Sequence, residues 1–192
     1  MTATANAPVK VWTEAKLTAL QEDDFIHEVV DGELVISPKN NWSHGRICTR
    51  LLISIGNFVN SHRLGAVLDS STGFWMSNRN CRAPDVSFVP KARIAALGFR
   101  PNETRFFPGA PDLAIEVLSE NNTRAELDER LKDFFASGTQ IVWIIEPDRQ
   151  RAEVCHSLMR RELLGSGGFL DGEHLLPGFR FPIADLFKEW DR

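Results

Sequence analysis

Residues 140–145 read QIVWII and are almost continuously apolar. A strand with one face in solvent alternates polar and apolar residues, so this unbroken run predicts a strand buried on both faces. Residues 123–137 before it predict a helix with an apolar stripe, and residues 113–118 predict another strand. A strand, a helix and a strand in this order form a parallel crossover. The sequence therefore predicts an α/β fold.

The rest of the chain adds elements on both sides of this crossover. The expected order is a helix, three strands, a helix and a strand (αβββαβ), with extra strands near the C-terminus. The elements predicted by turn residues, caps and apolar spacing are a short helix from Thr13 to about residue 21, a hairpin over 25–36 turning at Asp31–Gly32, a long helix over 43–62 stopped by Gly65, an antiparallel meander at 66–69, 73–76 and 84–89, a short helix over 91–97, edge strands within 151–181 and a closing helix over 183–190.

Length and composition limit the class of protein. A chain of 192 residues with 43% hydrophobic and 25% charged residues predicts one folded domain over 1–192, with residues 1–11 as a flexible segment. The longest stretches without Asp, Glu, Lys or Arg are 51–62 and 134–145, shorter than the roughly 18 apolar residues of a membrane span. The start lacks a secretory signal pattern, and three scattered cysteines suit a reducing compartment. We expect a cytoplasmic protein without a membrane partner.

Positive charge is concentrated in the middle of the chain. Residues 39–105 hold ten Lys and Arg against three acids, a balance of +7, whereas the rest holds 12 basic and 23 acidic residues, a balance of −11. A polyanion is expected to approach the middle segment, although a solvated basic face explains the charge equally well.

Two carboxylates stand out because they lie in apolar strands. Asp85 follows Pro84 at the start of one strand, and Glu116 lies inside the strand that opens with Pro111–Asp112. A carboxylate among apolar neighbours must be paired, hydrogen-bonded or metal-bound. If the two strands are adjacent, both acids can hold a hard cation such as Mg²⁺ or Mn²⁺. The alternative is a salt bridge from Glu116 to a buried arginine.

The motifs together resemble a known family. HEVVDGELVISP, RAPDVSFVP, PDLAIEVLS, FFASG, VWIIEP and LPGFRFPIADLF follow one another from about residue 12 to 188. This succession resembles the Uma-type family of restriction endonuclease-like proteins within the PD-(D/E)xK nuclease superfamily. The resemblance implies a restriction endonuclease-like core, a mixed sheet flanked by helices, and metal-dependent hydrolysis of DNA phosphodiester bonds.

The resemblance also assigns roles to individual residues. It makes Asp85 and Glu116 the metal ligands and Glu28 a further acid of the site, although an outward-facing polar position in a strand explains Glu28 as well. The family's lysine corresponds to Arg130, eight residues before Gly138, and Lys132 on the opposite edge of the same helix is the alternative. Arginine supplies positive charge to a phosphate but cannot act as a general base.

The remaining expectations concern partners. His44, Arg46 and Arg50 near the start of the long helix, with Arg82 in the basic segment, are the predicted nucleic-acid contacts, and a capping or surface role explains His44 equally well. Superfamily analogy suggests a homodimer. The alternatives are a nuclease-like binding module that has lost cleavage through the lysine change, and a structural domain without a nucleic-acid role.

Overall fold

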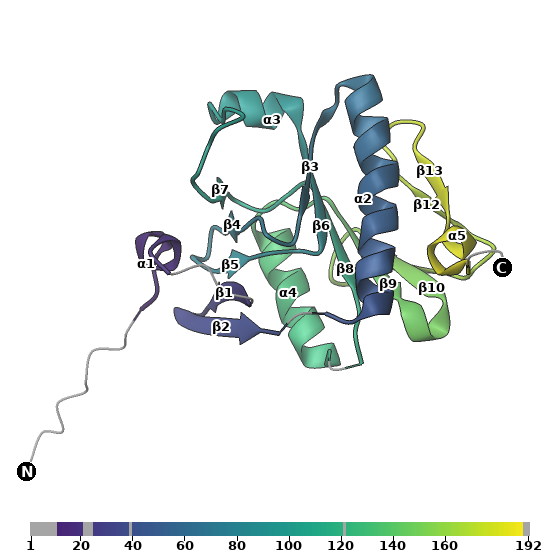
Figure 1. Cartoon of the computed structure of the whole chain (residues 1–192), viewed down its shortest axis with the longest axis horizontal. Coiled ribbons are helices and arrows are strands. Elements are labelled where there is room, and N and C mark those ends of the chain that lie inside the picture. The colour runs from purple at the N-terminus through teal and green to yellow at the C-terminus, as the bar shows by residue number, and fades with distance from the viewer. Residues whose placement is uncertain (1–10, 21–24, 39, 121, 190–192) are drawn as a thin grey trace, which may run out of the picture.

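The computed structural model describes residues 11–20, 25–38, 40–120 and 122–189. Its centre is a six-stranded mixed sheet (Figure 1), which confirms the expected α/β fold of a mixed sheet flanked by helices. The strands across this sheet are, in spatial order, β11 (Arg161–Leu164), β10 (Arg151–Cys155), β9 (Ile141–Glu146), β8 (Leu113–Val117), β6 (Val86–Pro90) and β3 (Gly65–Asp69). β8 and β9 run parallel, as the crossover predicted, and the other neighbours are antiparallel.

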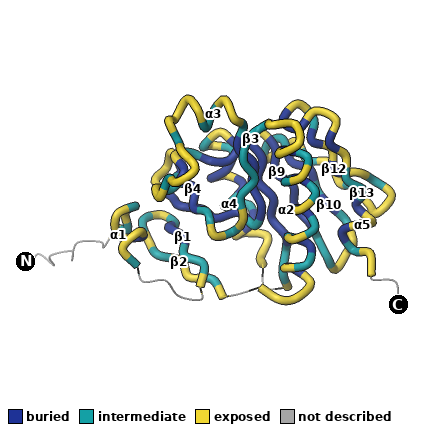
Figure 2. Tube along the Cα trace, turned by 45° about the horizontal axis from the view of Figure 1, so that its top comes forward, coloured by how far each residue is buried: buried dark blue, intermediate teal, exposed yellow. Residues whose placement is uncertain are grey.

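Two long helices cover opposite faces of this sheet. They are α2 (Trp42–His62) and α4 (Arg124–Ala136). Along β9, Trp143 and Ile145 pack on the side of α2, whereas Val142 and Ile144 pack on the side of α4. All four side chains are buried, so the apolar run is accounted for by helices on both faces. Figure 2 shows the buried residues concentrated on these central strands.

A second sheet lies beside the first. Its strands are, in spatial order, β2 (Glu33–Ser37), β1 (Ile26–Val30), β5 (Cys81–Arg82), β4 (Phe74–Trp75) and β7 (Phe107–Pro108). The predicted hairpin is confirmed: β1 and β2 join through Asp31 and Gly32, whose φ angles are 49° and 81°. The predicted meander is wrong, because β3 and β6 pair with each other while β4 and β5 belong to the smaller sheet. Phe74 is fully buried on the α4 side, which draws β4 out of the larger sheet.

The smaller elements complete the chain. They are α1 (Glu14–Thr18), α3 (Lys91–Ala96), a 3₁₀ turn (Pro147–Arg149), β12 (Phe169–Asp171), β13 (Arg180–Pro182) and α5 (Ile183–Phe187). Thr13 caps α1 as expected, and residues 1–10, the predicted helix end near 21 and the end of the closing helix at 190 lie outside the described residues. Among the helices described, none has the length and apolar character required to cross a membrane.

The long helix ends differently from the prediction. Arg63, with φ 55°, takes the left-handed position after α2, and Gly65 is already the first residue of β3. A Cβ on Gly65 would lie 2.0 Å from the carbonyl oxygen of Val89. Gly65 is therefore required by the close approach of β3 to β6 and not by the end of the helix.

Two glycine substitutions test this assignment. Gly65→Ala should lower the free energy of unfolding by about 1–3 kcal/mol, because the methyl group overlaps backbone that cannot move alone. Gly56→Ala, inside α2 with open space at the Cβ position, should raise it by about 0.5–1 kcal/mol. Urea denaturation measures both, and equal stability of the two variants would contradict the assignment.

Candidate active site

Asp85 and Glu116 lie at one end of the β6–β8 pair. The register sets Val86 opposite Ile115, and continuing it by one residue sets Asp85 opposite Glu116. Opposite residues of antiparallel strands carry their side chains on the same face, with Cβ atoms about 4.5–5.5 Å apart. The Val117 amide donates to Asp85 Oδ2 at 2.8 Å, and both acids line one cavity of about 100 Å³. The structure thus brings together the two carboxylates singled out in the sequence.

Glu116 is the more perturbed of the two acids. Its residue is 8% exposed and sits in the apolar strand β8. Burial raises the pKa of Glu116 to about 7; the charge of Arg130 opposes this shift, and the charges of Asp85 and Glu28 reinforce it. A further cation beside this carboxyl group would stabilise its ionised form and lower its pKa.

Arg130 reaches the site from α4. Its two terminal nitrogens donate to Glu28 Oε2 at 2.6 Å and to Glu116 Oε1 at 2.9 Å, so the guanidinium bridges two acids from different strands. Burial lowers the pKa of Arg130, but the charges of Glu116 and Glu28 outweigh burial and raise it. Lys132, the alternative cation, is exposed on α4. The salt bridge between Glu116 and a buried arginine, expected as an alternative to a metal, is therefore present.

Glu28 faces inward from β1. It is 3% exposed, which rules out the reading of an outward polar position. Its Oε1 accepts a hydrogen bond from the Ala83 amide at 2.8 Å, and its Oε2 accepts from Arg130 and lies 3.5 Å from a nitrogen of Arg82. Glu28 thus ties the hairpin to the strand that leads into Asp85.

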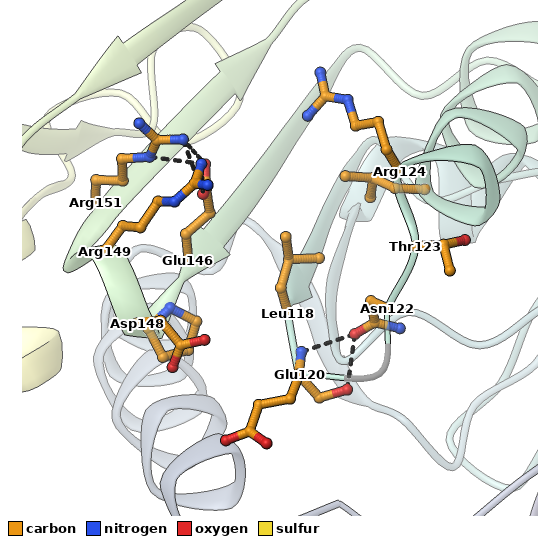
Figure 3. Close-up of a pocket in the computed structure, with 12 residues that line it drawn as sticks. Leu118, Glu120, Asn122, Thr123, Arg124, Glu146, Asp148, Arg149 and Arg151 are labelled. Carbon is orange, nitrogen blue, oxygen red and sulfur yellow. Dashed lines mark hydrogen bonds and ion pairs between the residues drawn. The ribbon is translucent and has the colours of Figure 1, made fainter.

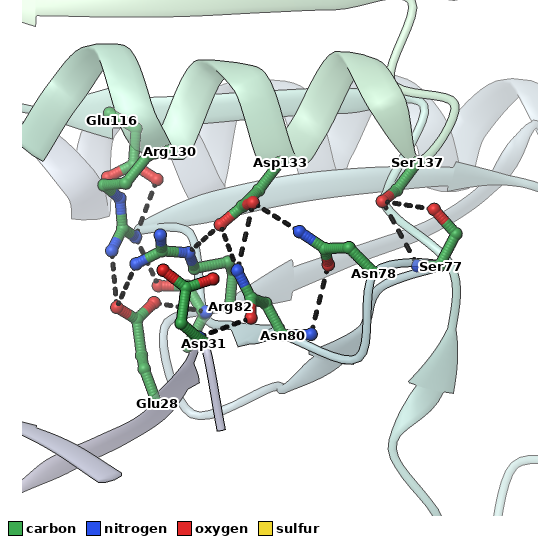
Figure 4. A network of polar contacts seen from close by, with 11 residues as sticks. Glu28, Asp31, Ser77, Asn78, Asn80, Arg82, Glu116, Arg130, Asp133 and Ser137 are labelled. Carbon is green, nitrogen blue, oxygen red and sulfur yellow. Dashed lines mark hydrogen bonds and ion pairs between the residues drawn. The ribbon is translucent and has the colours of Figure 1, made fainter. Parts of the chain in front are cut away.

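A second buried cation continues this network (Figure 4). Arg82 Nε donates to Asp133 Oδ2 at 2.6 Å, and the side-chain amides of Asn78 and Asn80 also donate to Asp133. The sequence prediction placed Arg82 on nucleic acid, but the residue is 5% exposed and engaged by Asp133 and Glu28. Asp133 escaped prediction, although an acid beside the apolar stripe of a helix was a signal.

The network has an excess of negative charge. Four acids (Glu28, Asp85, Glu116 and Asp133) face two arginines (Arg82 and Arg130), which leaves a formal charge of −2 when Glu116 is ionised and His44 is neutral. Within the described part of the chain, Asp85 Oδ1 and Glu116 Oε2 accept no hydrogen bond. Two free carboxylate oxygens at a site of this charge fit a hard divalent cation such as Mg²⁺.

The other predicted nucleic-acid contacts are engaged within the protein. His44 is 6% exposed, and its Nε2 is 3.1 Å from Asp85 Oδ2; burial lowers the pKa of His44, but the hydrogen bond and charge of Asp85 raise it above 6.5 overall. Arg46 and Arg50 donate to main-chain carbonyls of residues 185–188, at the end of α5. These arginines therefore join α2 to α5, and a DNA contact by any of them remains a prediction.

A second hollow of about 320 Å³ lies at the carboxyl ends of the parallel strands β8 and β9 (Figure 3). Glu146 in its wall is held by Arg151 at 2.9 Å and by Arg149 at 3.3 Å, so its charge is neutralised by two arginines. Asn122 lines both this hollow and the acid cavity. The hollow thus adjoins the site at the edge of the sheet where α/β proteins commonly hold ligands.

The family and the fold are those of a restriction endonuclease-like protein. Residues 14–184 match the family model of Uma2, described as "Putative restriction endonuclease", and the chain belongs to that family. The fold is similar to that of a crystal structure described as a putative nuclease belonging to DUF820, from Anabaena variabilis. The TM-score is 0.78 at 22% identity, over 92% of this chain and 97% of that chain. No curated protein matches the sequence.

The cost of burying an ionised Glu116 can be measured as stability. Because the pKa of Glu116 is higher in the fold than in the unfolded chain, the ionised carboxylate costs stability above about pH 7, and this cost fades as the pH falls. Glu116→Gln should therefore be more stable than the wild type by ~1–3 kcal/mol at about pH 8 with chelator present, and the difference should shrink by about pH 5.

Thermal or urea unfolding at both pH values provides the measurement. Glu120→Gln, at an exposed carboxylate beyond the end of β8, is the matched control and should show no gain. A Glu116→Gln variant that is less stable than the wild type at both pH values would contradict the assignment of a destabilising charge.

Proposed function

We propose that this protein is a metal-dependent endonuclease that hydrolyses phosphodiester bonds of DNA. Family membership supports a nuclease. The observation that carries the proposal is the cross-strand register of Asp85 with Glu116, each with one carboxylate oxygen free of hydrogen bonds in the described chain. Both acids line one cavity.

In this proposal two acids bind the cation, and neighbouring groups hold one of these acids in position. Asp85 and Glu116 would hold Mg²⁺ or Mn²⁺, which when bound supplies Lewis-acid activation of water and of the phosphate. The Val117 amide and His44 hold one oxygen of Asp85, which limits the rotation of this carboxylate at the wall of the cavity. This orientation by hydrogen bonds lowers the entropic cost of binding the cation.

Arg130 occupies the position that corresponds to the family's lysine. Its guanidinium remains protonated and so supplies charge but no general base. Through Glu116 it holds the second metal ligand in place, and it places positive charge beside the site where a phosphate gains negative charge.

The same contact supports a second candidate, a nuclease-like module that binds nucleic acid without cleaving it. Arg130 already neutralises part of the charge of Glu28 and Glu116 without a metal. An internal cation of this kind weakens the attraction of these carboxylates for a metal ion. The arginine is therefore the residue that decides between cleavage and binding.

Plasmid nicking in Mg²⁺ or Mn²⁺ tests the metal ligands. The wild type should nick DNA, and Asp85→Asn and Glu116→Gln should each lower the rate by at least ~100-fold, because each removes a charged ligand. Asp112→Asn is the matched control, since Asp112 is a buried acid of the same chain segment that pairs with Arg93, away from the cavity. A wild type that nicks equally well in chelator, or an active Asp85→Asn variant, would overturn the proposal.

Arg130→Lys and Arg130→Gln separate the two candidates. If the protein cleaves DNA, Arg130→Gln should lower the rate by at least ~10-fold, because positive charge is lost, and Arg130→Lys should keep most of it. An inert wild type that gains nicking activity on Arg130→Lys, at unchanged DNA affinity in a gel-shift assay, would instead establish the binding module.

A further inference from the structure

His44, Cys48 and Asp85 form a compact group at the edge of the candidate active site. His44 and Cys48 lie one turn apart on α2, and Asp85 precedes β6. His44 Nδ1 is 3.4 Å from Cys48 Sγ, and His44 Nε2 is 3.1 Å from Asp85 Oδ2. One ligand atom from each residue lies within 4.8 Å of the others. In the described ranges, no other group of His, Cys, Asp and Glu meets this criterion.

The donor types differ from those of the proposed Mg²⁺ pair. Imidazole, thiolate and carboxylate are the donors that Zn²⁺ takes in four-coordinate sites, whereas Mg²⁺ prefers oxygen alone. Donor atoms about 2.0–2.3 Å from a tetrahedral Zn²⁺ are about 3.3–3.8 Å apart. In the structure the ligand atoms lie within 4.8 Å of one another, so the side chains must rotate to bring them to the spacing of a Zn²⁺ site.

The surroundings of Cys48 are negatively charged. The negative charges of Asp85 and Glu116 act on the Cys48 thiol. The same field attracts a cation. Coordination forms the bond from sulfur to metal and releases the thiol proton to solvent, so no oxidant or other reactant is required. Of the three residues, Asp85 also lines the acid cavity.

We propose that His44, Cys48 and Asp85 bind a thiophilic divalent cation such as Zn²⁺, with water completing the coordination. The group uses one acid of the oxygen-only pair and two residues outside it. Because Asp85 is common to both, Zn²⁺ bound here weakens Mg²⁺ binding at Asp85 and Glu116; this consequence rests on the proposed function, whereas the Zn²⁺ site itself does not.

Co²⁺ is the probe, since a cobalt–thiolate bond gives a charge-transfer absorption in the near ultraviolet. Chelator-treated, reduced full-length protein should develop this band on titration with Co²⁺ and lose it when Zn²⁺, but not the same concentration of Mg²⁺, is added. Cys48→Ser should abolish the band, and Cys155→Ser, at a buried cysteine outside the group, should keep it. His44→Gln should weaken Co²⁺ binding by at least ~10-fold.

Three outcomes overturn the site: no band in the wild type, a band that survives Cys48→Ser, or a band lost on Glu116→Gln, which would replace the ligand set. Zn²⁺ should also raise the melting temperature of the wild type but not of Cys48→Ser. If Cys48→Ser fails to fold, Cys48→Ala serves instead, because alanine suits a helix. A wild type with the band but no DNA cleavage would overturn the proposed function and leave this site standing.

Discussion

The structure is organised around a carboxylate buried in an apolar sheet. Glu116 lies in β8 between side chains that pack on α2 and α4, where an uncompensated charge would be costly. Arg130 reaches it from α4, Glu28 holds the other side of that guanidinium from the hairpin, and Arg82 and Asp133 extend the network. Three segments far apart in the sequence therefore meet at one charge. The excess negative charge that remains supports the proposal of a cation site.

The sequence predicted the framework well because the framework follows from local patterns. The apolar run of β9, the apolar stripe of α4 and the hairpin turn at Asp31–Gly32 each carry their signal within a few residues, and all three elements were confirmed. The prediction of a meander was wrong because the pairing of these strands depends on contacts with residues far away in the sequence. Phe74 packs on the α4 side, and that contact cannot be recognised from its neighbours in sequence.

The site was predictable in its acids but not in its contacts. A charged residue inside or next to an apolar strand is recognisable in the sequence, and Asp85 and Glu116 were predicted on this basis. Whether a basic residue faces solvent depends on the tertiary structure, and here Arg50 and Arg82 are engaged by α5 and by Asp133. Arg46 and Arg93 are half-buried as well, whereas Arg63, Arg79, Lys91, Arg100 and Arg105 are exposed. The positive balance of the middle segment is therefore divided between internal contacts and the surface, and it does not by itself describe a DNA-binding surface. Cys48 was not predicted as a site residue. Its place beside His44 follows from the spacing of one helical turn, but its approach to Asp85 depends on the tertiary structure.

The placement of Arg130 on α4 has a mechanical consequence. The same thirteen-residue helix buries Leu131 and Phe134 against the sheet and delivers the guanidinium to two acids. A slip of one position along its axis would turn the helix by about 100° and carry Arg130 away from both. The packing of the core and the pairing of the buried charges thus both depend on the position of one helix. Substitutions in the hydrophobic core beneath α4 will therefore displace the charged side chains of the network without replacing any of them.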